Sequence, residues 1–149
     1  MTESEDELYA QMRFGPNDDS IERLGIFVAW LVNHRLLCDE IEQSASRSVA
    51  RVRLQDLTGS EFLSTVLHGD LRQAHLSERG NAFTREYFVT GRFNDDLDEV
   101  SSERHRKMDP WARYDHIAPV ITKAYEAWRL SLRPSPLTRL AKILPFRRR

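Results

Sequence analysis

Imidazole and carboxylate side chains, which are common zinc ligands, occur close together at His68, Asp70 and His75. Gly69 lies between them and is typical of a helix end, so the three side chains do not share one helical face. The sequence places no fourth ligand at a fixed spacing from them. We therefore interpret these residues as polar turn residues, and we predict no metal site and no cofactor.

A denser group of carboxylates occurs at Asp95, Asp96, Asp98 and Glu99. It lacks the ligand spacing and the glycine of a calcium-binding loop. Residues 93–100 carry their apolar side chains at helical spacing. We therefore predict an exposed acidic helix face, which is our candidate surface for binding a partner.

The sequence contains little that is typical of an enzyme. Asp115 and His116 form half of a general-base arrangement, but neighbours in a helix point to different sides. The single cysteine, Cys38, is most simply a small apolar residue at a helix end. A chain with one cysteine cannot form an intramolecular disulfide. The six glycines are scattered and form no phosphate-binding loop. We predict no catalytic residues and a protein that is not an enzyme.

The two ends of the chain carry opposite charge, although the formal net charge is only −1. Residues 1–20 contain six acids and one base, whereas residues 129–149 contain seven bases and no acid. The tail bases that follow the Pro134–Pro136 break are Arg139, Lys142, Arg147, Arg148 and Arg149. Three interpretations stay open for this tail: docking on the protein's own acidic segments or disorder, contact with a membrane surface or acidic partner, and contact with nucleic acid. Nucleic acid is the least favoured of them.

The element that must organise the fold is the stretch from Asp19 to Cys38, which contains seven consecutive apolar residues at 26–32. Such a run needs cover on nearly every side. The Asp19–Glu22 spacing is a capping box and favours a helix over a buried strand. The run is too short to span a membrane, which takes roughly 20 apolar residues.

Further helices are predicted mainly from their capping signals. Thr58 with Glu61 forms a capping box, Ser77 opens another helix, and Asp109 precedes a proline at a first helical position. Residues 39–48 are polar with small residues, and residues 44–46 predict a loop before a helix near 47–54. Pro119 predicts a kink or a fresh start. No run alternates strictly enough to require a sheet. We predict a mainly α protein, with five to six helices packed around a central buried helix in one compact domain.

These patterns divide the chain into three parts. Residues 1–19 form an acidic arm, residues 20–132 form the helical domain, and residues 133–149 form a proline-containing linker and a basic amphipathic tail. The N-terminus is acidic and has no hydrophobic segment of the kind found in signal peptides. We therefore expect a cytoplasmic protein.

Four stretches resemble the motifs of a family of bacterial proteins that carry a domain of unknown function. The stretches are Leu24-Gly25-Ile26-Phe27-Val28-Ala29-Trp30, Leu57-Thr58-Gly59-Ser60-Glu61-Phe62-Leu63, Leu76-Ser77-Glu78-Arg79-Gly80-Asn81-Ala82-Phe83 and Trp111-Ala112-Arg113-Tyr114-Asp115-His116-Ile117-Ala118-Pro119-Val120-Ile121. The resemblance covers about residues 20–130 and implies a small, mostly helical, cytosolic protein with no established reaction. The basic tail is not part of the common pattern.

Three of the shared residues are polar and are less easily explained by core packing: Asn81, Tyr114 and Asp115. Two roles stay open for them. They either bond backbone groups at helix junctions or line a common groove.

The residues favour a non-enzymatic protein-binding domain, such as a bacterial immunity or antitoxin-type inhibitor that occludes a basic toxin surface with its acidic face. The alternative is a peripheral membrane or anionic-partner adaptor that acts through the tail. An enzyme that combines His116, Asp115 and Asn81 in a groove is the least favoured reading.

Overall fold

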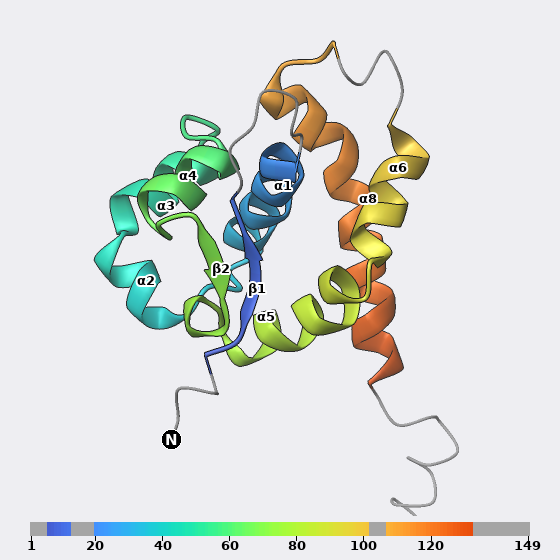
Figure 1. Cartoon of the computed structure of the whole chain (residues 1–149), viewed down its shortest axis with the longest axis horizontal. Coiled ribbons are helices and arrows are strands. Elements are labelled where there is room, and N and C mark those ends of the chain that lie inside the picture. Colours follow the sequence, from blue (N-terminus) through green and yellow to red (C-terminus); the bar gives the residue numbers. More distant parts are fainter. Residues whose placement is uncertain (1–5, 13–19, 102–106, 133–149) are drawn as a thin grey trace, which may run out of the picture.

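The computed structural model describes residues 6–12, 20–101 and 107–132, and its helices surround one central helix (Figure 1). The described residues contain seven α-helices, one 3₁₀ turn, one π-helical segment and two short strands. The predicted fold class, a compact mainly α domain around a central buried helix, is therefore confirmed. The predicted cap at Asp19 lies outside the described residues.

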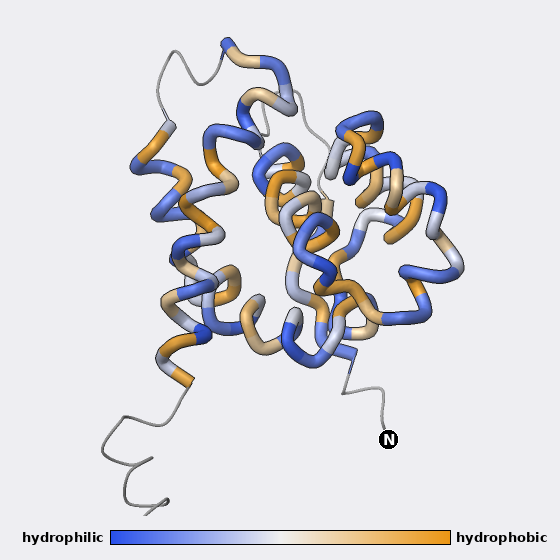
Figure 2. The backbone as a smooth tube through the Cα atoms, turned by 180° about the vertical axis from the view of Figure 1, so that it is seen from behind, coloured by the Kyte–Doolittle hydropathy of each residue, from blue (hydrophilic) through white to orange (hydrophobic). Residues whose placement is uncertain are grey.

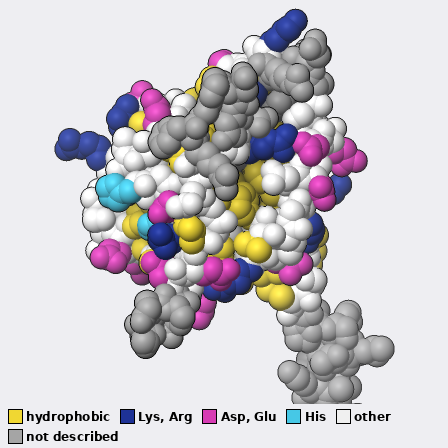
Figure 3. All heavy atoms as spheres, viewed as in Figure 1, with side chains coloured by type: hydrophobic (Ala, Val, Ile, Leu, Met, Phe, Trp, Pro, Cys, Tyr) yellow, Lys and Arg dark blue, Asp and Glu magenta, His cyan; other side chains and the backbone are white. Residues whose placement is uncertain are grey.

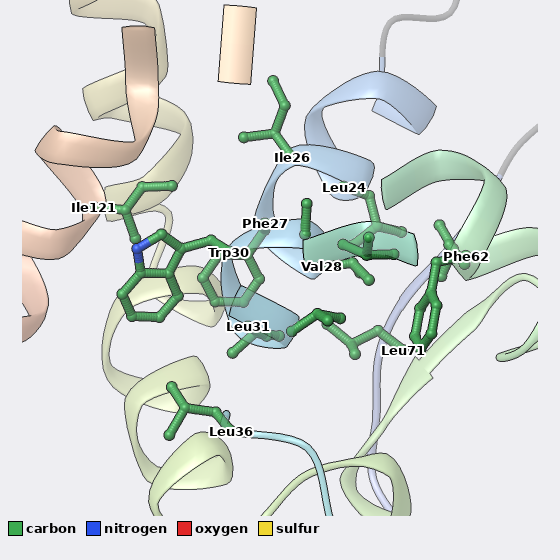
Figure 4. Close-up of a cluster of buried hydrophobic side chains, with 14 of the residues drawn as sticks. Leu24, Ile26, Phe27, Val28, Trp30, Leu31, Leu36, Phe62, Leu71 and Ile121 are labelled. Atoms are coloured by element: carbon green, nitrogen blue, oxygen red, sulfur yellow. The ribbon is translucent and has the colours of Figure 1, made fainter. Parts of the chain in front are cut away.

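The central helix is α1 (Ser20–Asn33), as the apolar run predicts. Nine consecutive residues, 24–32, are buried, so neighbours cover every side of this helix (Figure 4). The helix ends before Arg35, which has a left-handed backbone with φ of +58°. Arg53 closes this end, because its guanidinium donates to the Val32 carbonyl at 2.9 Å and pairs with Glu42 at 2.7 Å. These bonds satisfy a carbonyl that the end of a helix otherwise leaves unpaired.

Helix α4 (Gly59–Thr65) crosses α1 at very short range. The Thr58–Glu61 capping box is present, with the Glu61 amide donating to Thr58 Oγ1 at 3.1 Å and the Thr58 amide donating to Glu61 Oε1 at 2.9 Å. A Cβ atom at Gly59 would lie 1.8 Å from the Gly25 carbonyl oxygen. The two backbones can meet this closely only because both crossing residues lack a side chain.

Helices α2 (Asp39–Ser44) and α3 (Ser46–Arg53) follow α1. The loop predicted at residues 44–46 is reduced to a turn at Ala45, and helix α2 was not predicted. This helix buries no residue, so it has no apolar stripe to reveal it in the sequence, and Figure 2 shows it as a mostly hydrophilic stretch. Its first turn carries the acids Asp39, Glu40 and Glu42, which interact favourably with the N-terminal end of a helix dipole.

A small antiparallel sheet joins the N-terminal segment to the helical body. Strand β1 (Leu8–Gln11) pairs with β2 (Asp70–Arg72), with Ala10 opposite Leu71 and a register irregularity between Leu8 and Ala10. Strands of four and three residues are too short for a clear alternating pattern, which is why the sequence did not require them. The 3₁₀ turn η2 (Gln73–His75) follows β2.

The next three elements lead to the acidic cluster, which lies on the last of them. Helix α5 (Glu78–Phe83) begins at Ser77, whose hydroxyl accepts the Gly80 amide at 3.0 Å, as predicted. It continues into the π-helical segment η3 (Thr84–Val89) and then into α6 (Arg92–Val100). Gly91 joins η3 to α6 with a φ of +91°, a backbone conformation that favours glycine.

The last described helix, α8 (Pro110–Ser131), packs against both α1 and α6. Asp109 caps it as predicted, accepting the Ala112 amide at 2.9 Å. The helix runs continuously through Pro119, so a fresh start at this residue was wrong. Ile117 and Ile121, which flank the proline, are buried against the core, and this packing offsets the hydrogen bond that the proline cannot donate.

The α1–α4 crossing predicts that one methyl group added at the contact lowers the stability of the fold. We expect Gly59→Ala to lower the free energy of unfolding by about 1–3 kcal/mol, because the new Cβ forces the two backbones apart. Chemical denaturation followed by circular dichroism measures this change.

The matched control is Gly91→Asn, since a Cβ at Gly91 meets nothing within 4 Å and asparagine tolerates a positive φ. We expect a loss of less than about 1 kcal/mol at this position. Equal losses for the two variants would contradict a steric origin of the effect.

Candidate functional site

The predicted acidic face lies on α6, where the helix divides into a buried and an exposed side. Phe93 and Leu97 point into the core, with 1% and 3% of their surfaces exposed. Asp95, Asp98 and Glu99 are exposed on the outer side. Figure 3 shows acidic side chains gathered at the edge of the molecule where Figure 1 places α6. These three residues form what we call the acidic face.

Asp96 belongs to the interior side of α6 and not to this face. It accepts a hydrogen bond of 2.5 Å from the hydroxyl of Tyr87, whose side chain is buried. Burial and this hydrogen bond to Asp96 raise the pKa of Tyr87 well above its ordinary value. Asp96 therefore fastens α6 to η3, and the predicted four-residue surface is reduced to three exposed carboxylates.

Asp98 shares its charge with a neighbouring arginine. Arg23 of α1 donates to Asp98 Oδ1 at 2.6 Å and to Asn94 Oδ1 at 3.3 Å. The carboxylate keeps 64% of its side chain exposed, so this is a surface ion pair that contributes little to stability. Within the described residues, Asp95 and Glu99 form no ion pair, and they carry the negative charge that the acidic face offers to a partner.

Asn81, the first of the three predicted groove residues, is buried and bonded within the fold. Its Nδ2 donates to the carbonyls of Gln73 and Leu76 at 3.1 and 3.2 Å. Its Oδ1 accepts the Tyr9 hydroxyl at 2.8 Å. The side chain thus joins α5, η2 and β1, which is the backbone-bonding role that the sequence left open.

Tyr114 and Asp115, on α8, contact other parts of the structure. Tyr114 accepts a bond of 2.9 Å from Asn33 at the end of α1, and burial raises the pKa of Tyr114 to about 12. Asp115 accepts a bond of 3.0 Å from Gln55. Their hydrogen bonds share no residue with those of Asn81. Tyr114 therefore lies at the end of α1 and Asp115 at the turn after α3, whereas Asn81 lies beside the small sheet.

A small cavity does adjoin Tyr114. It has a volume of about 30 Å³ and is lined by residues of α1, by the α1–α4 crossing and by the first turn of α8. This volume corresponds to about one water molecule. The cavity is a packing gap beside the Gly25–Gly59 crossing and is too small to bind a substrate.

The histidines of the β2 region are placed as turn residues. His75 Nδ1 accepts the Arg72 amide at 3.0 Å, and Asp70 pairs with Arg72 at 3.1 Å. In the part of the chain that the structure describes, no three His, Cys, Asp or Glu side chains are close enough to hold a metal ion. The tail residues Arg139, Lys142, Arg147, Arg148 and Arg149 lie outside the described residues. No described helix has the length and apolar character needed to cross a bilayer.

A polar junction between α1 and α8 was not anticipated from the sequence. Thr122 Oγ1 accepts the indole N–H of Trp30 at 3.0 Å and lies 3.4 Å from His34 Nε2. The His34 ring stacks on Trp30 with centroids 4.1 Å apart, and its Nδ1 lies 3.0 Å from the Trp30 carbonyl oxygen. Because Nδ1 donates to that carbonyl, the neutral ring accepts at Nε2 from the Thr122 hydroxyl. The two contacts of Thr122 span 92 and 88 residues of sequence, so no local signal could reveal them.

This junction predicts a stability that depends on pH. Burial lowers the pKa of His34 below its ordinary value of 6.5, so the unfolded chain binds the proton more tightly than the folded one. We expect the His34 contribution to be complete above about pH 6.5 and to be lost as the pH falls toward the lower pKa of the folded state. Its slope is at most about 1.4 kcal/mol per pH unit.

Denaturant titrations between about pH 7.5 and 5 on wild type and His34→Gln measure this contribution. The variant should show a shallower fall of stability with decreasing pH. His75, whose pKa burial also lowers, provides the part of the slope that remains. Identical pH profiles would show that His34 is not a linked group.

No curated protein and no solved structure matches the chain. One family model matches residues 11–109, from the end of β1 to the cap of α8, which is more than half of the chain. The predicted resemblance to a family with a domain of unknown function is confirmed at this level, while the predicted bacterial origin stays a prediction. The chain belongs to the family described as domain of unknown function (DUF7832).

Proposed function

We propose that this protein is a non-enzymatic binding domain whose acidic face on α6 docks on a basic surface of a partner protein. An inhibitor of the immunity or antitoxin type, acting in the cytoplasm by occluding a toxin, is the form of this function that we favour. The observation that carries the proposal is that the α6 carboxylates divide into one that the fold uses and others that face outward. Asp96 is bonded inside the fold, and Asp95 and Glu99 face outward without an ion pair in the described structure.

The anchoring of α6 supports a binding role. Phe93 packs against Phe27 of α1 with ring centroids 5.3 Å apart, and Tyr87 bonds Asp96 from η3. A face that is fixed before binding loses little conformational freedom in the complex, which favours affinity. Leu97 adds a second buried contact on the inner side of the same helix.

The charge of the face supports a basic partner. Exposed carboxylates on a rigid helix attract cationic side chains and raise the rate of association at low ionic strength. Toxins that act on nucleic acids present basic surfaces of this kind. Occlusion of such a surface requires shape and charge complementarity and no catalytic group, which agrees with the structural use of Asn81 and Asp115.

The proposal predicts that neutral isosteres in the face weaken capture of the partner. We expect the double variant Asp95→Asn, Glu99→Gln to slow association by roughly tenfold at low salt, and this difference should shrink as salt is added. Affinity purification with the full chain from its native cells, with mass spectrometry, identifies the partner. Biolayer interferometry with the purified partner then measures the rates.

The matched control, Asp39→Asn with Glu40→Gln, removes the same charge from exposed positions on α2. It should associate at the wild-type rate, and both double variants should retain the wild-type melting curve to within a few degrees. Equal effects of the two double variants, or no stoichiometric partner for the wild type, would contradict the proposal. Capture that depends on Arg147–Arg149 and not on α6 would favour the adaptor role of the tail.

A further inference from the structure

A hollow lies beside the acidic face and has no assigned role. Its volume is about 500 Å³, within the roughly 300–1,000 Å³ range of binding pockets. It is lined by β1, the first turns of α1, η3 and the first turn of α6. Figure 3 shows apolar side chains in the middle of this face of the molecule, where Figure 1 places β1 and α1.

The walls of the hollow combine apolar and polar side chains. The apolar ones are Ala10, Leu24 and Phe88. Leu24 is only 4% exposed, and Phe88 is half-buried with its ring stacked on Phe27 at 4.9 Å. This stacking makes the apolar wall part of the core, so its shape is fixed before any ligand arrives.

The polar residues connect the hollow to the acidic face. Asn94 lines the hollow and lies one turn before Asp98 on α6. Arg23 lines it too and donates to both of these side chains. The Asn94–Asp98 pair thus already accepts one guanidinium group, which shows that this edge of α6 is suited to basic side chains.

Arg23 also bears on what the hollow can accept. Its charge is neutralised by Asp98 at 2.6 Å, so an anionic ligand would compete with a carboxylate that is already in place. An apolar side chain does not disturb this pair and covers the exposed parts of Ala10 and Phe88. Large apolar anchors in fixed pockets, ringed by polar contacts, provide most of the affinity in many interfaces.

We propose that the hollow binds one large apolar side chain from a basic segment of the partner protein, whose neighbouring Lys or Arg residues contact Asp95 and Glu99. This inference rests on the proposed function and deepens it, because it defines the sequence type of the segment that is recognised. The recognised segment combines an aromatic or long aliphatic residue with at least two basic residues close by.

A display library of random peptides of about twelve residues, selected on the immobilised full chain, tests the proposal. Selected peptides should share the combination of an apolar anchor and basic residues. Ala10→Phe fills the hollow from β1, and Asn94→Trp covers it from α6. We expect each variant to bind the synthesised consensus peptide with an affinity roughly tenfold or more below that of wild type, as measured by isothermal titration calorimetry.

Two controls separate this effect from unfolding and from loss of the acidic face. Ala50→Phe adds the same bulk on an exposed position of α3 and should bind like wild type. A second peptide, with its basic residues kept and its apolar anchor changed to Ser, should bind roughly tenfold more weakly to wild type. Its affinity should not differ between wild type and Asn94→Trp.

The role of the hollow would be overturned by peptides whose binding requires Asp95 and Glu99 but is as strong to Ala10→Phe and Asn94→Trp as to wild type. That result would leave the proposed function intact. Selection of no peptide, or of peptides without basic residues, would also overturn it. The capture of a partner protein through the acidic face is measured separately, so the failure of one idea is distinguishable from the failure of the other.

Discussion

The close approach of two glycines, Gly25 on α1 and Gly59 on α4, is the constraint on which the rest of the structure depends. A carbonyl oxygen of one helix occupies the space that a side chain of the other would fill. This contact lets α4 cover one side of α1 with backbone, while aromatic side chains cover the other. A chain of this size has one core, and here that core is built around a single helix whose run 24–32 is buried.

The aromatic side of α1 positions the candidate site. Phe27 lies within 6.4 Å, between ring centroids, of Phe83, Tyr87, Phe88 and Phe93. These four rings come from α5, η3 and α6, so one side chain of the central helix fixes three consecutive elements. The acidic face and the hollow beside it are therefore extensions of the core, and they inherit its rigidity.

The polar residues divide according to whether the fold uses them. Asn81, Asp96 and Asp115 each bond a partner from another element. Asn81 is buried, and a buried polar group that is left unbonded costs about 1–3 kcal/mol. Asp95 and Glu99 have no such use in the described structure and remain on the surface, where a carboxylate is well hydrated and available to a basic partner.

The sequence by itself determined what depends on near neighbours. The apolar run at 26–32 indicated the central helix, and the caps at Thr58, Ser77 and Asp109 placed three helix starts, because a capping bond joins residues only two or three positions apart. The acidic character of α6 was also readable, since it needs only composition and helical spacing. Helix α2 was missed because a helix that buries nothing leaves no periodic signal.

Only the tertiary structure decided which polar residues face inward and which elements meet. Asp95 and Asp96 are neighbouring residues of the same type, so the sequence does not distinguish their roles. The hydroxyl of Tyr87 in η3 bonds Asp96 within the fold, whereas Asp95 stays exposed. The β1–β2 pairing and the Trp30–Thr122–His34 junction join residues more than 50 positions apart. The energies of such contacts arise from packing that exists only in the folded chain, so no local pattern encodes them.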